Sequence, residues 1–217
     1  MPNIIFMGPA GSGKGAQADA LSKDLKIPTI STGLLLRDKA KVGGEKGKEI
    51  SEVINKGELV SDEIMFDILK KRLEMPDCKN GFILDGFPRT ENQAIILDKY
   101  LKNIDQKIDA VIVLDVPDDI VIKRISGRFQ CARCGTVYSK YFKKTKIDGI
   151  CDNCGSVEFL VRADDVDIRL IINRLDIYKN MSKSIIDYYD KKHLIYLING
   201  VNSIDKIYQD IKDILIK

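Results

Sequence analysis

Near its start the 217-residue chain reads Gly8-Pro9-Ala10-Gly11-Ser12-Gly13-Lys14-Gly15. A short apolar run over residues 3–8 leads into this stretch, and Ala18, Leu21 and Leu25 recur after it at helical spacing. A buried strand, a glycine-rich turn and a helix form the setting that a phosphate-binding loop requires. Because the stretch fits the pattern G-x-x-x-x-G-K at every defined position, we favour a phosphate loop over a turn that is merely rich in glycine.

The residue types of this loop suit a nucleoside triphosphate. Glycines let successive backbone N–H groups turn inward, and the positive end of the following helix adds to the attraction for phosphate. Lys14 supplies a mobile charge for the terminal phosphates. Gly15 stands where many such loops carry a serine or threonine that ligates Mg²⁺, so we expect phosphates and water to bind most of that ion. The expected ATP contacts here are Gly11, Ser12, Gly13, Lys14, Gly15 and Ala16.

Further strand-like runs follow along the chain, and helical patterns separate them. The runs cover residues 27–30, 82–85, 110–116 and 194–198, and a long helical pattern covers residues 164–189. Strands that alternate with helices favour a parallel sheet covered on both faces. We therefore predict an α/β fold like that of the P-loop NTPases, with a five-stranded parallel sheet flanked by helices.

Two segments interrupt this alternation. Residues 31–60 are polar and helical in pattern, whereas residues 128–162 combine cysteines, aromatic residues and lysines. We interpret the first segment as a helical insert and the second as a small insert held by a metal ion. Residues 1–30, 61–127 and 163–217 then form the core.

The overall composition excludes few functions. Hydrophobic residues make up 44% and charged residues 31% of the chain, and the net charge is +3. This charge is too small to predict nucleic-acid or membrane partners. No apolar window approaches the roughly 18 residues of a membrane span, and no secretory signal is visible. We expect a cytoplasmic protein with reduced cysteines.

The cysteines are grouped. Cys131-x-x-Cys134 and Cys151-x-x-Cys154 form two pairs, and a glycine follows each pair. A short Cys-x-x-Cys turn points two thiolates at one place, so two such turns predict a tetrahedral, structural zinc site. Four thiolates also suit iron, and two disulfides are the alternative that a reducing compartment disfavours. A closed site of this kind leaves no position for a catalytic water.

Four more motifs carry a family resemblance, and they are Ser31-Thr32-Gly33-x-x-x-Arg37, Asp85-Gly86-Phe87-Pro88-Arg89-x-x-x-Gln93, Gly127-Arg128 and Arg162-Ala163-Asp164-Asp165. Together with the phosphate loop, they resemble the adenylate kinases from Ile4 to about Tyr189. The resemblance implies reversible, Mg²⁺-dependent transfer of a phosphoryl group from ATP to AMP, which gives two ADP and maintains adenine nucleotide balance. It also implies that residues 31–60 bind the nucleoside monophosphate and that residues 128–162 form a zinc-binding lid.

Phosphoryl transfer needs positioning and positive charge more than covalent chemistry. The catalytic residues implied by the resemblance are Lys14, Asp85, Arg89, Arg128, Arg162 and Arg174. The implied AMP contacts are Thr32, Arg37, Glu58, Leu59, Val60, Gly86, Phe87, Pro88, Arg89, Gln93, Arg162 and Arg174. The implied ATP contacts outside the loop are Arg124, Arg128, Val137, Tyr138 and Asn202. The expected partners are ATP, AMP and ADP, without nucleic acid or membrane, and the expected state is a monomer.

The chain departs from the family pattern at a few positions. Ala16 replaces a common threonine, and the interval from Arg162 to Arg174 is one residue longer than usual. One extra residue turns a helix by about 100°. Because Arg174 keeps its usual distance to the Asp187-Tyr188-Tyr189 segment, we favour it over Arg169, although a solvated surface arginine is an alternative for Arg124 and Arg174.

Three other functions stay open at this point. A kinase for UMP, CMP or GMP is the nearest, although the amide of Gln93 can pair with an adenine edge and so favours AMP over a pyrimidine nucleotide. A nucleic-acid-binding zinc ribbon would use the lysines and aromatic residues near the cysteines, but it leaves Arg37 and Arg89 unexplained. A regulatory P-loop ATPase would hydrolyse ATP without an acceptor.

Overall fold

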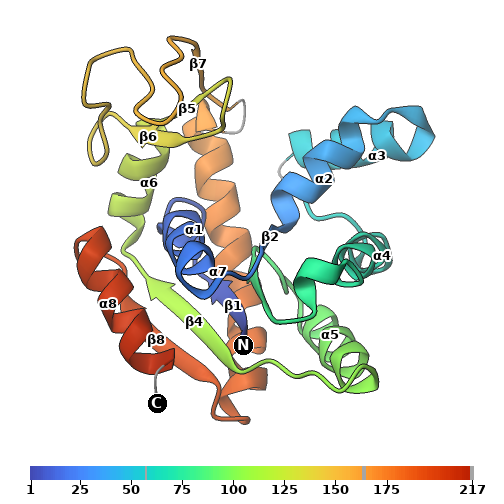
Figure 1. The fold of residues 1–217 in the computed structure, drawn as a ribbon. Helices are drawn as coiled ribbons and strands as arrows, with labels where there is room; N and C mark the ends of the chain where they lie inside the picture. Colours follow the sequence, from blue (N-terminus) through green and yellow to red (C-terminus); the bar gives the residue numbers. More distant parts are fainter. Residues whose placement is uncertain (57, 163–164, 216–217) are drawn as a thin grey trace.

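The computed structural model describes residues 1–56, 58–162 and 165–215 (Figure 1). At its centre lies a five-stranded sheet in the order β2-β3-β1-β4-β8, and every neighbouring pair is parallel. The strands are β1 (Asn3–Met7), β2 (Thr29–Ser31), β3 (Phe82–Asp85), β4 (Ala110–Asp115) and β8 (Ile195–Asn199). The predicted five-stranded parallel sheet is confirmed, with strand ends within two residues of the expected ones.

Helices cover both faces of this sheet, because successive side chains of a strand point to opposite sides. Ile5 and Met7 of β1 pack into a hydrophobic layer with α4, α5 and α7, whereas Ile4 and Phe6 pack against α1 and α8. The helices of the core are α1 (Lys14–Leu25), α4 (Asp62–Leu73), α5 (Glu91–Asn103), α6 (Asp118–Ser126), α7 (Ile168–Asp190) and α8 (Ile204–Leu215), with a short 3₁₀ turn η1 (Pro76–Cys78).

The order of the strands determines where a ligand can bind. Strand β1 lies between β3 and β4, so the loop after β1 and the loop after β3 are neighbours at the carboxyl edge of the sheet. Open α/β sheets bind ligands at this edge, where the strand order reverses. The phosphate loop and Asp85 therefore meet there.

The first interruption of the core is helical, as predicted. It contains α2 (Thr32–Lys41) and α3 (Gly44–Asn55), which pack against each other to one side of the sheet's carboxyl edge (Figure 1). Gly43 and Gly44 join them with φ values of +79° and +76°, a region that residues with a Cβ avoid. The turn therefore allows α3 to fold back onto α2.

The second interruption, which we call the lid (residues 128–162), has a small antiparallel sheet of its own. Its strands β5 (Arg128–Cys131), β6 (Val137–Ser139) and β7 (Phe159–Leu160) lie in the order β6-β5-β7. These strands are too short to show an alternating pattern, so they were not predicted. Figure 1 shows the lid beyond α6 and the start of α7, across from α2 and α3.

No helix among the described residues is both long enough and apolar enough to cross a membrane.

Candidate active site

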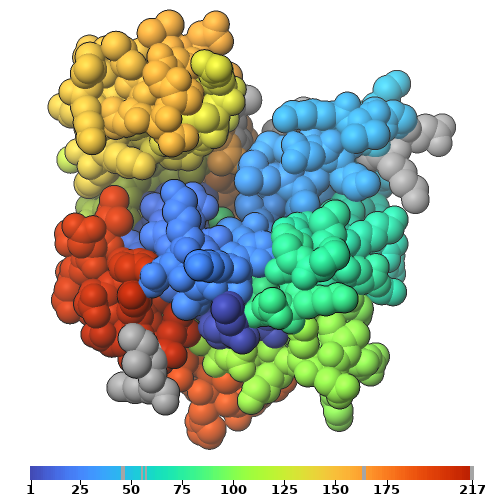
Figure 2. All heavy atoms as spheres, viewed as in Figure 1, coloured from blue at the N-terminus to red at the C-terminus, as the bar shows by residue number. Residues whose placement is uncertain are grey.

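A hollow separates the lid from α2 and α3 on the face shown in Figure 2. The phosphate loop lies at the base of this region, between β1 and α1. Gly11 and Gly13 adopt φ values of +80° and +103°, and a Cβ on Gly11 would lie 2.6 Å from Cγ1 of Ile125. Gly13 begins α1 without a side-chain cap, so the first amides of this helix remain available for an anion.

Lys14 lies over this loop. Its Nζ donates hydrogen bonds to the carbonyl oxygens of Gly8 (2.6 Å) and Pro9 (2.8 Å). Loss of hydration lowers the pKa of Lys14 to about 8, although the charge of Asp85 partly opposes this shift and nearby arginines add to it. A bound phosphate would replace the two carbonyl partners and would favour the charged amine.

Asp85 ends β3 beside the loop. Its Oδ2 lies 3.9 Å from the place that a Cβ on Gly15 would occupy, so the carboxylate borders the start of α1. A carboxylate next to a phosphate-binding loop suits Mg²⁺, which keeps several of its waters and needs few protein ligands. The Asp85 carboxylate could therefore take part in holding Mg²⁺ although Gly15 offers no hydroxyl.

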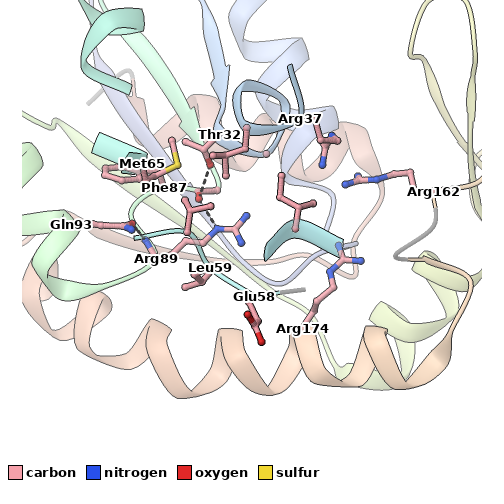
Figure 3. A pocket seen from close by; sticks show the side chains of 15 residues that line it. Thr32, Arg37, Glu58, Leu59, Met65, Phe87, Arg89, Gln93, Arg162 and Arg174 are labelled. Carbon is pink, nitrogen blue, oxygen red and sulfur yellow. Dashed lines mark hydrogen bonds between the residues drawn. The ribbon is translucent and has the colours of Figure 1, made fainter. Parts of the chain in front are cut away.

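A second site lies between the insert and the core (Figure 3), as a cavity of about 110 Å³. Eleven of the twelve residues predicted to contact AMP line it, and Pro88, which is buried and follows a cis peptide bond, is the exception. The lining also includes four residues that sequence reasoning missed, namely Gly33, Leu36, Ile54 and Met65. Leu36 and Met65 could have been found from the helical spacing of α2 and α4.

The floor of this cavity is organised around the carbonyl of Gly86. Thr32 Oγ1 and Arg89 Nε both donate to that oxygen at 2.9 Å. Arg37, Arg162 and Arg174 direct their guanidinium groups toward the same space in Figure 3. A site rimmed by several guanidinium groups is suited to a phosphate, because each group can form two parallel hydrogen bonds.

Asp165 links two of the predicted catalytic arginines. Arg128 donates to it through Nε and Nη2, both at 2.7 Å, and Arg174 donates through Nη1 at 3.0 Å. The Asp165 side chain is fully buried, which alone would raise its pKa, but the arginines hold the pKa below its usual value. Asp165 was noticed only as part of a motif, since its partners lie far away in the sequence. Ala163 and Asp164 of that motif lie outside the described residues.

Arg174 and Arg169 lie on different sides of α7. Arg174 lines the cavity, whereas the Arg169 side chain is 87% exposed and pairs with Asp167 at 2.8 Å. The extra residue before Arg174 is therefore accommodated without turning that side chain away from the cavity. Arg174 is not a solvated surface arginine.

Arg124 joins the phosphate loop to the far end of the sheet. It donates to the carbonyls of Ser12 (3.0 Å) and Gly200 (2.9 Å), near exposed Asn202. Its guanidinium lies 5.4 Å from the centre of the Phe142 ring, a contact that sequence reasoning missed. The surroundings remove water from Arg124 and lower its pKa.

Of the two lid residues predicted near ATP, Val137 is exposed, but Tyr138 is not. The Tyr138 side chain is 1% exposed and belongs to the lid core with Phe129 and Phe159. Its Oη accepts from the backbone N of Asp152 (2.8 Å) and lies 3.4 Å from Cys151 Sγ. Only the backbone of Tyr138 could therefore face a nucleotide.

The four lid cysteines converge. Their sulfur atoms all lie within 4.8 Å of one another, and Cys131–Cys154 and Cys134–Cys151 are each 3.6 Å apart. Tetrahedral zinc with bonds of about 2.3 Å needs sulfur–sulfur edges of about 3.8 Å, so these residues fit a Cys₄ metal site. All four are free thiols, which contradicts the disulfide alternative. Cys78 is buried apart from them.

A phosphate loop beside a cavity rimmed by arginines, below a lid whose four cysteines fit a metal ion, is the arrangement of a nucleoside monophosphate kinase of the P-loop class. The family model for adenylate kinase matches residues 6–194. The chain therefore belongs to the adenylate kinase family and is a phosphotransferase with the activity of that family.

Several relatives share nearly the whole chain. The adenylate kinase of Archaeoglobus fulgidus is 46% identical over 215 residues, which are 99% of this chain and 98% of the relative. Those of Limosilactobacillus reuteri (44%, 98% of both chains) and Methanosarcina barkeri (45%, 99% of both chains) are similar to the same extent. No large insertion or deletion therefore separates this chain from these proteins.

Proposed function

We propose that the chain transfers the terminal phosphoryl group of ATP to AMP, reversibly, across the cleft between the insert and the lid. The observation that carries this proposal is the pair of positively charged regions, the phosphate loop around Lys14 and the cavity lined by Arg37 and Arg89. In this proposal residues 31–60 bind the acceptor and residues 128–162 close over the donor. Residues 1–30, 61–127 and 163–217 form the core that holds both.

The donor site begins with the loop amides. Lys14 would release the carbonyls of Gly8 and Pro9 and bind the β- and γ-phosphates instead. Arg124, with Phe142 against it, would stack on the adenine, and Val137 and the backbone near Asn202 would border it. Mg²⁺, when bound with ATP, would neutralise phosphate charge, and Asp85 is positioned to orient its waters.

The acceptor site would hold AMP by its phosphate and its base. Thr32, Arg37 and Arg89 would take the phosphate, since they converge on one wall of the cavity. The remaining contacts would surround the ribose and adenine, and they are Glu58, Leu59, Val60, Gly86, Phe87, Pro88 and Gln93.

The transfer itself would depend on the arginines. The transferred group spreads negative charge over its equatorial oxygens, and guanidinium groups stabilise that charge. Arg128 and Arg174 are both hydrogen-bonded to Asp165. Arg162, at the end of the lid, and Arg89 line the acceptor cavity. Closure of the lid would bring these groups together and exclude water, so that ATP is not wasted by hydrolysis.

The lid would owe its shape to a structural zinc ion, which when bound holds the four cysteines in place. We propose a cytoplasmic location, because free thiols of this kind need a reducing compartment. The proposed partners are ATP, AMP and ADP, without nucleic acid, and the proposed state is a monomer.

The decisive test is phosphoryl transfer from ATP to AMP, CMP, UMP and GMP, assayed side by side. We expect rapid turnover with AMP and conversion of ADP alone, with Mg²⁺, into ATP and AMP. Release of inorganic phosphate without an acceptor would instead identify a regulatory ATPase. Preferred use of another monophosphate would assign the chain a different acceptor.

Two arginines of α7 form a matched pair for a second prediction. Arg174→Ala should lower kcat by about 10²- to 10³-fold, because a group that stabilises transition-state charge is lost. Arg169→Ala should leave kcat within about 2-fold, since Arg169 is exposed and pairs only with Asp167 among the described contacts. Steady-state kinetics of the two variants check this, and equal effects would contradict the assigned helix phase.

The pKa of Lys14 gives a prediction for pH dependence. This pKa lies at about 8, so the ligand-free enzyme loses the Lys14 charge as the pH rises through that value. We expect kcat/KM for ATP to fall above about pH 8, because this quantity reports groups of the free enzyme. In contrast, kcat should stay level to higher pH, since bound phosphates raise the pKa again. A flat kcat/KM between pH 7 and 9.5 would refute the prediction.

A further inference from the structure

The side-chain amide of Gln93 forms hydrogen bonds with an acceptor on one side and a donor on the other. Its Nε2 donates to Asp62 Oδ1 at 2.7 Å, and its Oε1 accepts from the backbone N of Arg89 at 2.7 Å. The Gln93 side chain is 2% exposed and reaches the wall of the acceptor cavity (Figure 3). Both amide atoms can form one more hydrogen bond, because the nitrogen has a second hydrogen and the oxygen has a second lone pair.

Asp62 is itself fixed. It lies in the first turn of α4 and accepts from Thr90 Oγ1 (3.1 Å) and Asn92 Nδ2 (2.8 Å). Thr90 in turn caps α5, where its Oγ1 accepts from the backbone N of Gln93 at 3.1 Å. The carboxylate therefore connects the start of α4 to the start of α5 and cannot easily turn away from the amide.

These contacts allow only one orientation of the amide. An ionised carboxylate can only accept hydrogen bonds, and a backbone N–H can only donate one. If the amide of Gln93 flipped, its oxygen would face the Asp62 carboxylate and its nitrogen would face the Arg89 N–H. Both hydrogen bonds would become repulsive contacts in a buried place, where unsatisfied polar groups are costly.

The orientation matters because a freely flipping amide would read two kinds of purine. Adenine presents an exocyclic amino donor beside a ring-nitrogen acceptor, whereas guanine and hypoxanthine present a carbonyl acceptor where adenine has its amino group. On the Watson–Crick edge the neighbouring ring nitrogen also changes, from an acceptor in adenine to an N–H donor in guanine and hypoxanthine. One amide orientation therefore matches the first pattern, and the flipped orientation matches the second. A glutamine whose amide can flip therefore excludes neither adenine nor the 6-oxopurines.

We propose that Asp62 is a positioning residue that sets acceptor specificity: by fixing the amide of Gln93 between Asp62 and the Arg89 N–H, it makes the site accept AMP and reject 6-oxopurine monophosphates. This inference rests on the proposed role of Gln93 beside the acceptor base. Asp62 itself lies behind Gln93 and need not touch the nucleotide.

The test compares AMP with IMP, whose bases differ at the 6-position, as acceptors from ATP. Asp62→Asn keeps the shape of the side chain, but its carboxamide can pair with either orientation of Gln93, so that only the Arg89 N–H still opposes the flipped amide. We expect the ratio of kcat/KM for AMP to kcat/KM for IMP to fall by about 10- to 100-fold. Glu63→Gln removes the neighbouring, exposed carboxylate of the same helix turn and should leave the ratio unchanged.

The ratio does not depend on the fraction of folded enzyme, so partial unfolding of Asp62→Asn would not hide the result. An unchanged ratio, or an equal loss with both acceptors, would mean a merely structural role and would overturn the proposal. Gln93→Leu tests the underlying assumption. If Gln93→Leu also leaves the ratio unchanged, the glutamine does not read the base; if it lowers the ratio and Asp62→Asn does not, only the fixing by Asp62 is wrong.

Discussion

Replacing Lys14 by methionine is expected to lower kcat by about 10³-fold or more. Methionine keeps the length of the side chain and removes the charge that would meet the transferred phosphoryl group. The fold should survive, because the hydrogen bonds of the Lys14 amine all stay within the phosphate loop, to the carbonyls of Gly8 and Pro9 and to Ser12 Oγ. Burial lowers the pKa of Lys14, so the folded loop disfavours the charged amine, and we do not expect removal of the charge to destabilise the loop.

Lys23→Met is the matched control, since Lys23 is an exposed lysine in the last turn of the same helix. We expect this control to keep full turnover, and we expect both variants to melt at the temperature of the unchanged protein. The measurements are coupled-assay kinetics and thermal unfolding. If Lys14→Met kept a tenth or more of the activity, the role of the phosphate loop in transfer would have to be abandoned.

The fold was largely predictable, because its deciding signals are local. The strand, turn and helix around Lys14 occupy one short stretch, and residues 110–116 and 194–198 are apolar runs of ordinary strand length. The lid sheet escaped prediction for the opposite reason. Strands such as Phe159–Leu160 are too short to carry a period, and their pairing with β5 is a tertiary contact.

The lining of the second cavity was predictable for a different reason, since the family resemblance implied eleven of its fifteen residues. The supporting residues were not. Asp62 contacts Gln93 from another helix, and Asp165 accepts hydrogen bonds from Arg128 at the start of the lid and from Arg174 in α7. Likewise, nothing in the sequence shows that the Tyr138 ring turns toward the cysteines. Such contacts depend on how elements pack, which spacing along the chain does not specify.

Replacing Cys131 by serine is expected to abolish stoichiometric metal binding and to unfold the lid. Structural zinc in small domains contributes about 10–16 kcal/mol, which is comparable with the about 5–15 kcal/mol that stabilises a whole domain. The lid has little else, because its core consists of three of the four cysteines with Phe129, Tyr138 and Phe159. The parallel sheet has separate hydrophobic layers, so it should stay folded.

This change is measured by metal analysis, hydrogen exchange and limited proteolysis. We expect the rates of hydrogen exchange and of cleavage to rise in residues 128–162 alone. Activity should fall as well, because Arg128 begins β5 and loses its position when that strand unfolds. Cys78→Ser is the matched control: this cysteine is buried in the main core, far in sequence from the cluster, and its loss should leave metal content unchanged. Unaltered metal content in Cys131→Ser, or a lid equally protected without metal, would show that packing and not coordination holds residues 128–162 together.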